Sequence, residues 1–250
     1  MDKTDLRQLI KKETGELIIP DSVQEIDDQA FAGCLELKSV IFPNNVEDIG
    51  YGAFEGCKNL TSITLPNTIS SISESSFAGC EELVSIRIPN SVKSIGRSAF
   101  EGCKKLKSIT LPNALTRIGD CAFSLCEELV SIDIPNTVNH IGQRAFLCCL
   151  KLRSVVIPDS VNVICRLAFG NCKELTNVSI PNSVTDIVNC AFADCKNLRS
   201  IEIPNSVKRI GRGAFERCVN LESAVIHNPD IIIEDGAFEG CINLHIEHQG

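Results

Sequence analysis

Apolar and polar positions follow a short pattern that returns every 23 residues along this chain. In residues 85–88, Ser-Ile-Arg-Ile, polar and apolar side chains alternate, which predicts a β-strand with both isoleucines facing inward. Pro89 follows and cannot donate to a strand ladder, so it predicts a turn. Residues 92–95 predict a second, shorter extended segment. Residues 99–103 predict a single helical turn, too short to stand alone and held by Phe100 in the core.

Three residue types keep the same 23-residue step over almost the whole chain. Proline occupies Pro20, Pro43, Pro66, Pro89, Pro112, Pro135, Pro158, Pro181 and Pro204. Phenylalanine occupies Phe31, Phe54, Phe77, Phe100, Phe123, Phe146, Phe169, Phe192, Phe215 and Phe238. Cysteine follows, in register, from Cys34 to Cys241. A fixed period of this length is typical of solenoids, in which each unit buries its core against its neighbours.

The period predicts an α/β leucine-rich-repeat solenoid of about ten units. We expect a parallel concave β-sheet from the first segments, a second short β-sheet, and short helical turns on the outer side. Rungs spaced roughly 4.8 Å apart would give a body about 48 Å long. Residues 1–16 are expected to form an N-terminal capping segment, and residues 17–250 the repeat domain. In the cap, Thr4 and Asp5 are candidate helix N-caps before the apolar residues Leu6, Leu9 and Ile10.

The internal consensus, Leu-x-Ser-Ile-x-Ile-Pro-Asn-Ser-Val-x-x-Ile-Gly-x-x-Ala-Phe-x-Gly-Cys-x-x, resembles the BspA-type leucine-rich repeats over about residues 17–246. The resemblance implies a right-handed solenoid and a role in adhesion or protein binding. Members of that family are often surface proteins of bacteria, or proteins of protozoan parasites, that contact a host or other cells. The last unit departs from the pattern, because His227 replaces the proline and Pro229 follows two places later.

Composition narrows the classes of partner and the locations that fit this chain. The net charge of −8 disfavours nucleic acid or an anionic membrane as partner. The apolar runs are only a few residues long, which predicts no membrane insertion. The charged start lacks the apolar core of a signal peptide, which favours a cytoplasmic location, or a surface location if the sequence is a fragment.

The fourteen cysteines could form disulfides, a metal site or a ladder of buried thiols. Ten of them share one inward-facing row, where parallel Cβ vectors fit disulfide geometry poorly, so we favour a reduced ladder. Four more lie outside that row, at Cys121, Cys148, Cys165 and Cys190. So many thiols favour a reducing compartment. A metal cluster of Cys241, His245 and His248 is the weaker alternative to a frayed last unit, because a fourth ligand is missing.

No catalytic, cofactor-binding or metal-binding motif stands out, so the sequence predicts a protein-interaction module and not an enzyme. The alternative is an intracellular scaffold, or a consensus-like repeat without a specific ligand. The expected recognition surface is the concave sheet, where exposed residues vary on a constant frame. Its candidate contacts are Thr64, Arg87, Thr110, Asp133, Arg153, Ser179, Arg199 and Glu202.

Two further expectations concern assembly. Charges alternate in sign from unit to unit after the row cysteine, as in Glu82, Lys105, Glu128 and Lys151, which predicts ion pairs between neighbouring units. The sequence ends within a predicted strand without a polar cap, which predicts either a fragment or end-to-end self-association.

Overall fold

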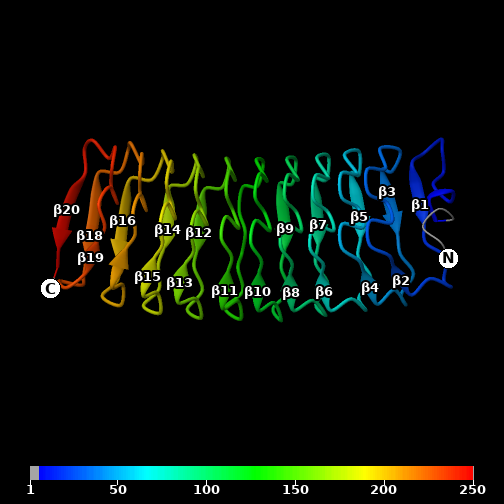
Figure 1. The fold of residues 1–250 in the computed structure, drawn as a ribbon, viewed down its shortest axis with the longest axis horizontal. Coiled ribbons are helices and arrows are strands. Elements are labelled where there is room, and N and C mark those ends of the chain that lie inside the picture. Colours follow the sequence, from blue (N-terminus) through cyan, green and yellow to red (C-terminus); the bar gives the residue numbers. More distant parts are fainter. Residues whose placement is uncertain (1–5, 250) are drawn as a thin grey trace.

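A computed structural model describes residues 6–249 of the chain. The repeats stack as rungs in a nearly straight row, with the N- and C-termini at opposite ends (Figure 1). Each rung contributes up to two short strands and then a run of turns. Rung-on-rung stacking makes almost every core contact a contact between neighbouring repeats, as expected for a solenoid.

The strands form two parallel arrays. The first array contains β1 (Glu16–Ile18), β3 (Ser39–Ile41), β5 (Ser62–Thr64), β7 (Ser85–Arg87), β9 (Ser108–Thr110), β12 (Ser154–Val156), β14 (Asn177–Ser179), β16 (Ser200–Ile203), β18 (Ser223–Ile226) and β20 (His245–His248). The second contains β2 (Glu25–Ile26), β4 (Asp48–Ile49), β6 (Ser71–Ile72), β8 (Ser94–Ile95), β10 (Arg117–Ile118), β11 (His140–Ile141), β13 (Val163–Ile164), β15 (Asp186–Ile187), β17 (Arg209–Ile210) and β19 (Ile232–Ile233). The two predicted segments of each repeat are therefore confirmed in nearly every rung.

The register places like residues above like. Val40 lies beside Leu17 on one side and Ile63 on the other, each one repeat away. The first array is nevertheless interrupted: it falls into the groups β1-β3-β5, β7-β9, β12-β14 and β16-β18-β20. Residues 131–133 take no strand conformation, although Ile132 is buried like its counterparts. The buried side chains thus follow the 23-residue repeat even where the backbone forms no strand.

The outer side of the repeats consists of turns, so the predicted helical turns and the α/β class are wrong, and the chain is a parallel-strand β-solenoid. The reason is visible around Cys121, Phe123 and Leu125, where the residues two before and two after the phenylalanine have φ of 56° and 60°. An α-helix requires consecutive negative φ, and a left-handed residue costs roughly 1–2 kcal/mol when it is not glycine. The same alternation lets the backbone bond to the next rung, as when the Phe123 N–H donates to the Ala145 carbonyl at 2.8 Å.

Phenylalanine rings form a continuous stack through the core. From Phe31 to Phe238, each ring lies parallel to the next, with centroids 5.1–5.6 Å apart and interplanar angles of 2–11°. Every ring from Phe31 to Phe215 is fully buried. Because identical residues lie in register, the neighbour of each ring along the solenoid axis is another phenylalanine ring, and the rings stack.

Row cysteines run alongside the rings as free thiols. Each one from Cys57 to Cys241 donates its Sγ–H to the carbonyl of a phenylalanine 26 residues earlier, at 3.1–3.3 Å. Burial raises the pKa of the Cys57 and Cys103 thiols to about 12. The row is therefore a hydrogen-bonded, unreactive part of the core.

The predicted ion pairs between neighbouring rungs are present. Lys105 contacts Glu82 at 2.6 Å, and Lys151 contacts Glu128 at 2.7 Å. The hydrogen bond from Lys151 lowers the pKa of the Glu128 carboxyl. Such exposed pairs are worth little in stability but help to hold the register.

Candidate partner-binding face

The candidate binding face is made by the outward side chains of the first strand array, here called the first-sheet face. A three-residue strand such as β7 buries its middle residue, Ile86, and exposes the residues on either side, Ser85 and Arg87. Period-two alternation thus fixes which side chains face outward. All eight predicted contacts are exposed: Thr64, Arg87, Thr110, Asp133, Arg153, Ser179, Arg199 and Glu202.

The structure brings three of these residues together in the middle of the face. Arg87 and Thr110 are direct neighbours in the pairing of β7 with β9. Thr110 and Asp133 then line a hollow of about 260 Å³, together with Asn113 and Pro135. The hollow coincides with the rung that has no first strand, so the interrupted ladder creates the depression.

A larger groove of about 500 Å³ lies nearer the C-terminal end, between β14 and β16. Ser179 and Glu202 line it, and Asn182, Asn205 and His227 complete its rim. His227 Nε2 lies 2.8 Å from Glu202 Oε1, an ion pair when the imidazole is protonated. Backbone pairing is interrupted here too, because β14 and β16 belong to separate hydrogen-bonded groups.

The sequence does not mark His227 as a residue of this groove. It shows only that His227 stands where other repeats carry proline. That substitution was the available signal, since a polar side chain in a column of prolines adds a hydrogen-bonding group beside the strands. The groove is therefore lined by hydroxyl, amide, carboxylate and imidazole groups.

The other predicted contacts stay apart. Thr64 ends β5, which is not hydrogen-bonded to β7. The Arg153 guanidinium is held by Glu174, with Nε 3.4 Å from Oε2. Arg199 lies just before β16, and among residues 6–249 its side chain has no ion-pair partner. Arg199 thus places a positive charge without an ion-pair partner among the described residues next to β16.

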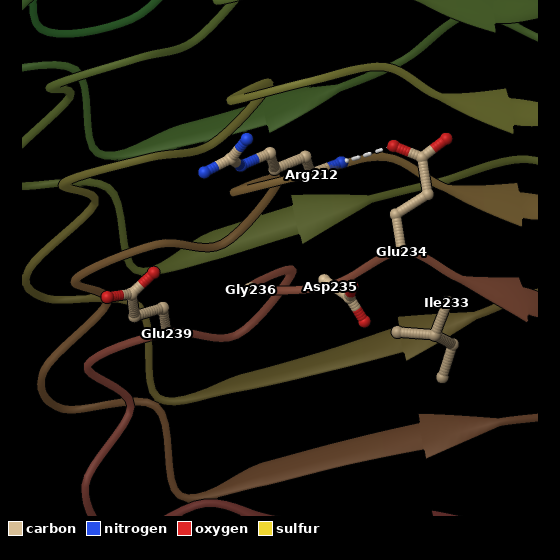
Figure 2. Close-up of a pocket in the computed structure, with 6 residues that line it drawn as sticks. All are labelled: Arg212, Ile233, Glu234, Asp235, Gly236 and Glu239. Carbon is tan, nitrogen blue, oxygen red and sulfur yellow. Dashed lines mark hydrogen bonds between the residues drawn. The ribbon is translucent and has the colours of Figure 1, made fainter.

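Another hollow, of about 620 Å³, lies off this face near the end of the second array. Figure 2 shows its lining residues, which include Arg212, Glu234, Asp235 and Glu239. The dashed line in that view is the Arg212 backbone N–H donating to Glu234 Oε2 at 2.8 Å. Three carboxylates and one guanidinium line this hollow, so its surface is ionic.

Other groups with possible chemistry have structural explanations. His140 is half-buried in β11, burial lowers its pKa, and its Nε2 has no hydrogen-bond partner within the described part of the chain. Among residues 6–249, no three His, Cys, Asp or Glu side chains converge as metal ligands would, and Cys241, His245 and His248 do not form such a group. No helix in that range is long and apolar enough to cross a membrane.

Comparison with known proteins gives the family. The model of the BspA type leucine-rich repeat region matches residues 11–129, 48–176 and 162–247. A leucine-rich repeat protein from Bacteroides ovatus is 33% identical, with a TM-score of 0.88 over 94% of this chain. The chain belongs to the BspA-type leucine-rich-repeat family. The predicted resemblance is thereby confirmed. This chain spans 63% of the length of the Bacteroides protein.

Two further solved structures are similar. A leucine rich cell surface protein from Faecalibacterium prausnitzii is 28% identical, with a TM-score of 0.54 over 94% of this chain and 79% of its own. The T. pallidum leucine-rich repeat protein is 29% identical, with a TM-score of 0.51 over 73% of this chain and 77% of its own. The comparison with curated proteins gave no match. Proteins with leucine-rich repeats are typically non-enzymatic modules that bind other proteins, and the matching family is not a catalytic one.

Proposed function

We propose that this protein is a non-catalytic interaction module that binds a protein partner through the first-sheet face. The proposal rests on the contrast between the inward residues of the strands, which hardly change from repeat to repeat, and the outward residues, which vary. The inward residues of the strands are Ile, Val or Leu in nearly every rung, whereas the outward row changes from Arg87 to Thr110, Asp133, Ser179 and Glu202. A rigid frame with a varied outer row is what a repeat protein needs to recognise an extended partner surface.

The chemistry of the face predicts the kind of contact. No Trp or Tyr lies in the outward row, and such residues dominate tight interfaces. Binding must then come from charge pairs and hydrogen bonds spread along several rungs, with the groove of Ser179, Glu202 and His227 as its most shaped part. We expect moderate affinity, a strong dependence on salt, and a partner with complementary cationic and anionic patches.

Adhesion is one version of this proposal. The similar Faecalibacterium protein, described as a cell surface protein, supports a partner displayed outside the cell. The fourteen free thiols support an intracellular partner or a scaffold, because thiols persist in reducing compartments. A fluorescent version of the protein, added to intact cells of a candidate host, separates the two versions. Saturable binding to the cells supports adhesion. Binding to an intracellular partner without binding to the cells supports an intracellular role.

The site itself is tested with a matched pair of triple variants. The face variant carries Arg87→Ala, Asp133→Ala and Glu202→Ala; the control removes the same charges elsewhere, in Arg97→Ala, Glu74→Ala and Glu25→Ala, all exposed positions outside the first strand array. Partners captured by the wild-type protein are identified, purified and titrated against all three proteins by calorimetry. The proposal predicts at least a tenfold weaker Kd for the face variant and an unchanged Kd for the control. Equal affinities would place the site elsewhere, and a wild-type protein without any saturable partner would favour the scaffold alternative.

A further inference from the structure

Charged side chains on the second strand array are sorted into two blocks. The outward side chains of residues 24–29, and of the equivalent residues in later rungs, are called the second-sheet face. In the rungs of β2, β4 and β6, the charged residues of this face are all acidic: Glu25, Asp27, Asp28, Glu47, Asp48 and Glu74. In the rungs of β8, β10 and β11, the face carries Lys93, Arg97, Arg117 and Arg144 with one carboxylate, Asp120. An acidic block thus precedes a basic block along the solenoid.

Like charges lie side by side within each block. Glu25 is the direct neighbour of Asp48 in the pairing of β2 with β4. Arg117 is the direct neighbour of His140 in the pairing of β10 with β11, and burial and the Arg117 charge lower the pKa of that imidazole. Like charges directly opposite each other on a sheet are destabilising. The lysines and glutamates of the rung-to-rung ion pairs, by contrast, alternate in sign.

The charges on either side of the boundary between the blocks have no ion-pair partner within the described chain. The side chains of Asp48, Glu74, Arg97 and Arg117 are all exposed. Among residues 6–249, none of these four side chains takes part in an ion pair. Charges that lower the stability of their own chain and pair with nothing in it are available to a second molecule.

The two blocks lie along one strip of the molecule. The row of rungs is nearly straight, and β4, β6, β8, β10 and β11 follow one edge of it (Figure 1). A two-fold axis along the strands, midway between the neighbours β6 and β8, would place this strip against its copy in a second chain. That rotation reverses the order of the rungs and keeps each position along the strand. Asp48 then faces Arg117 of the second copy, and Glu74 faces Arg97; each contact occurs twice.

We propose that the second-sheet face docks on the same face of a second copy of this chain, with the acidic block of each copy against the basic block of the other. The remaining positions fit this arrangement. Tyr51, which is 41% exposed, occupies the position that faces Asp120, so its hydroxyl can donate to that carboxylate. Ser71 faces Ser94 beside the axis, where small side chains allow close approach. The contact uses no residue of the first-sheet face, so its loss should leave the affinity of that face for a partner unchanged.

The charge blocks select one orientation of the two copies. A two-fold axis along the solenoid would keep the rung order and set acidic block against acidic block, which is unfavourable. The six rungs from β2 to β11 span roughly 24 Å at about 4.8 Å per rung, which is short for a stable interface. We therefore expect a weak dimer that forms at low ionic strength and dissociates as salt screens the charges.

Single charge reversals test the contact. Sedimentation equilibrium at low salt should show a concentration-dependent exchange between the 27.2 kDa monomer and a dimer of twice that mass. Asp48→Arg would set one arginine against another at Arg117, and Arg117→Asp would set one aspartate against another at Asp48, in both cases twice per dimer. Each variant should weaken dimerisation by about tenfold or more. Circular dichroism and cooperative unfolding check that each variant is folded.

Combining two reversals separates the proposed register from general charge attraction. In Asp48→Arg with Arg117→Asp, each new arginine faces a new aspartate, so dimerisation should return to within about threefold of wild type. The matched control is Glu74→Arg with Arg117→Asp, which has the same net charge but sets arginine against Arg97 and aspartate against Asp48. This control should stay monomeric. Both double variants remove one acid from the acidic block and one cation from the basic block, so only the register distinguishes them.

Three results would overturn the proposal. The first is a wild-type protein that stays monomeric at low salt and high concentration, which would leave the basic block to an acidic partner of another kind. The second is a dimer that neither salt nor Asp48→Arg weakens, since its contact would lie on another surface. The third is equal dimerisation of the two double variants when both are folded, because that would exclude the two-fold register.

Discussion

Removing one ring from the middle of the phenylalanine stack gives the sharpest prediction about stability. Phe123 is fully buried, and its ring lies 5.4 Å from both Phe100 and Phe146, nearly parallel to each. Phe123→Ala therefore removes the whole buried ring and two stacked contacts, and it leaves a cavity that neighbouring rungs cannot fill. Core Phe→Ala changes cost about 3–5 kcal/mol, and two lost ring contacts place this one near the upper end.

Phe238→Ala provides the matched comparison at the end of the stack. Phe238 is only half-buried and has a single stacked neighbour, Phe215, at 5.1 Å. Burying a side chain of this size contributes about 1.5–3 kcal/mol, and incomplete burial puts the loss near 2 kcal/mol. The two variants should thus differ by roughly 3 kcal/mol in the free energy of unfolding.

Urea titrations followed by circular dichroism measure the difference. Because stability in a stacked array passes from neighbour to neighbour, Phe123→Ala should also broaden the transition or split it in two, whereas Phe238→Ala should only shift it. Equal losses at the two positions, or a loss below about 1 kcal/mol at Phe123, would refute a core held together by stacked rungs.

Three further predictions follow from single positions. Gly142→Ala should lower the free energy of unfolding, measured by heat or urea, by about 3 kcal/mol or more, because the added Cβ would lie 2.5 Å from the Asp120 backbone nitrogen. Gly33→Ala should lower it by only about 1–2 kcal/mol, because Gly33 has a φ of +71° but no atom within 4 Å of the added Cβ. Burial lowers the pKa of His140 in the folded protein, so protonation favours the unfolded chain and stability should fall as pH drops below the ordinary value of 6.5. His140→Gln should flatten that pH dependence, and an unchanged profile would contradict the assignment. In a thiol-reagent assay, the nine buried row cysteines from Cys34 to Cys218 should react only after unfolding, and rapid native reaction of all fourteen would contradict the ladder.

The sequence predicted the repeat, both strand segments and the stacked core because each depends on side-chain burial, which leaves a period in the sequence. The outer turns were harder. Glycine at Gly33, Gly56, Gly79, Gly102 and Gly240 was a usable signal for left-handed backbone two places after the phenylalanine. In the middle rungs, however, Leu125 and Cys148 hold the same conformation at φ of 60°. There the hydrogen bonds to the next rung override the residue's own preference, and no local pattern reports that.

Exposure of the first-sheet face was also predictable, since strand alternation alone decides it. Which of those exposed residues lie close together could not be predicted. Which exposed residues share a hollow depends on where backbone pairing is interrupted, as around Asp133 and between Ser179 and Glu202. The strand sequences at the interruptions resemble those of the paired rungs, so the sequence does not mark where pairing stops. The sequence therefore indicated a surface, and the structure divided it into two polar hollows.

The central claim is that this solenoid binds a protein through its first-sheet face. The most direct measurement is the calorimetric Kd of one identified partner for the wild-type protein, for the variant Arg87→Ala, Asp133→Ala and Glu202→Ala, and for the charge-matched control on other faces. The account predicts at least a tenfold loss of affinity for the face variant and none for the control. Equal affinity for all three proteins, with folding intact, would contradict it.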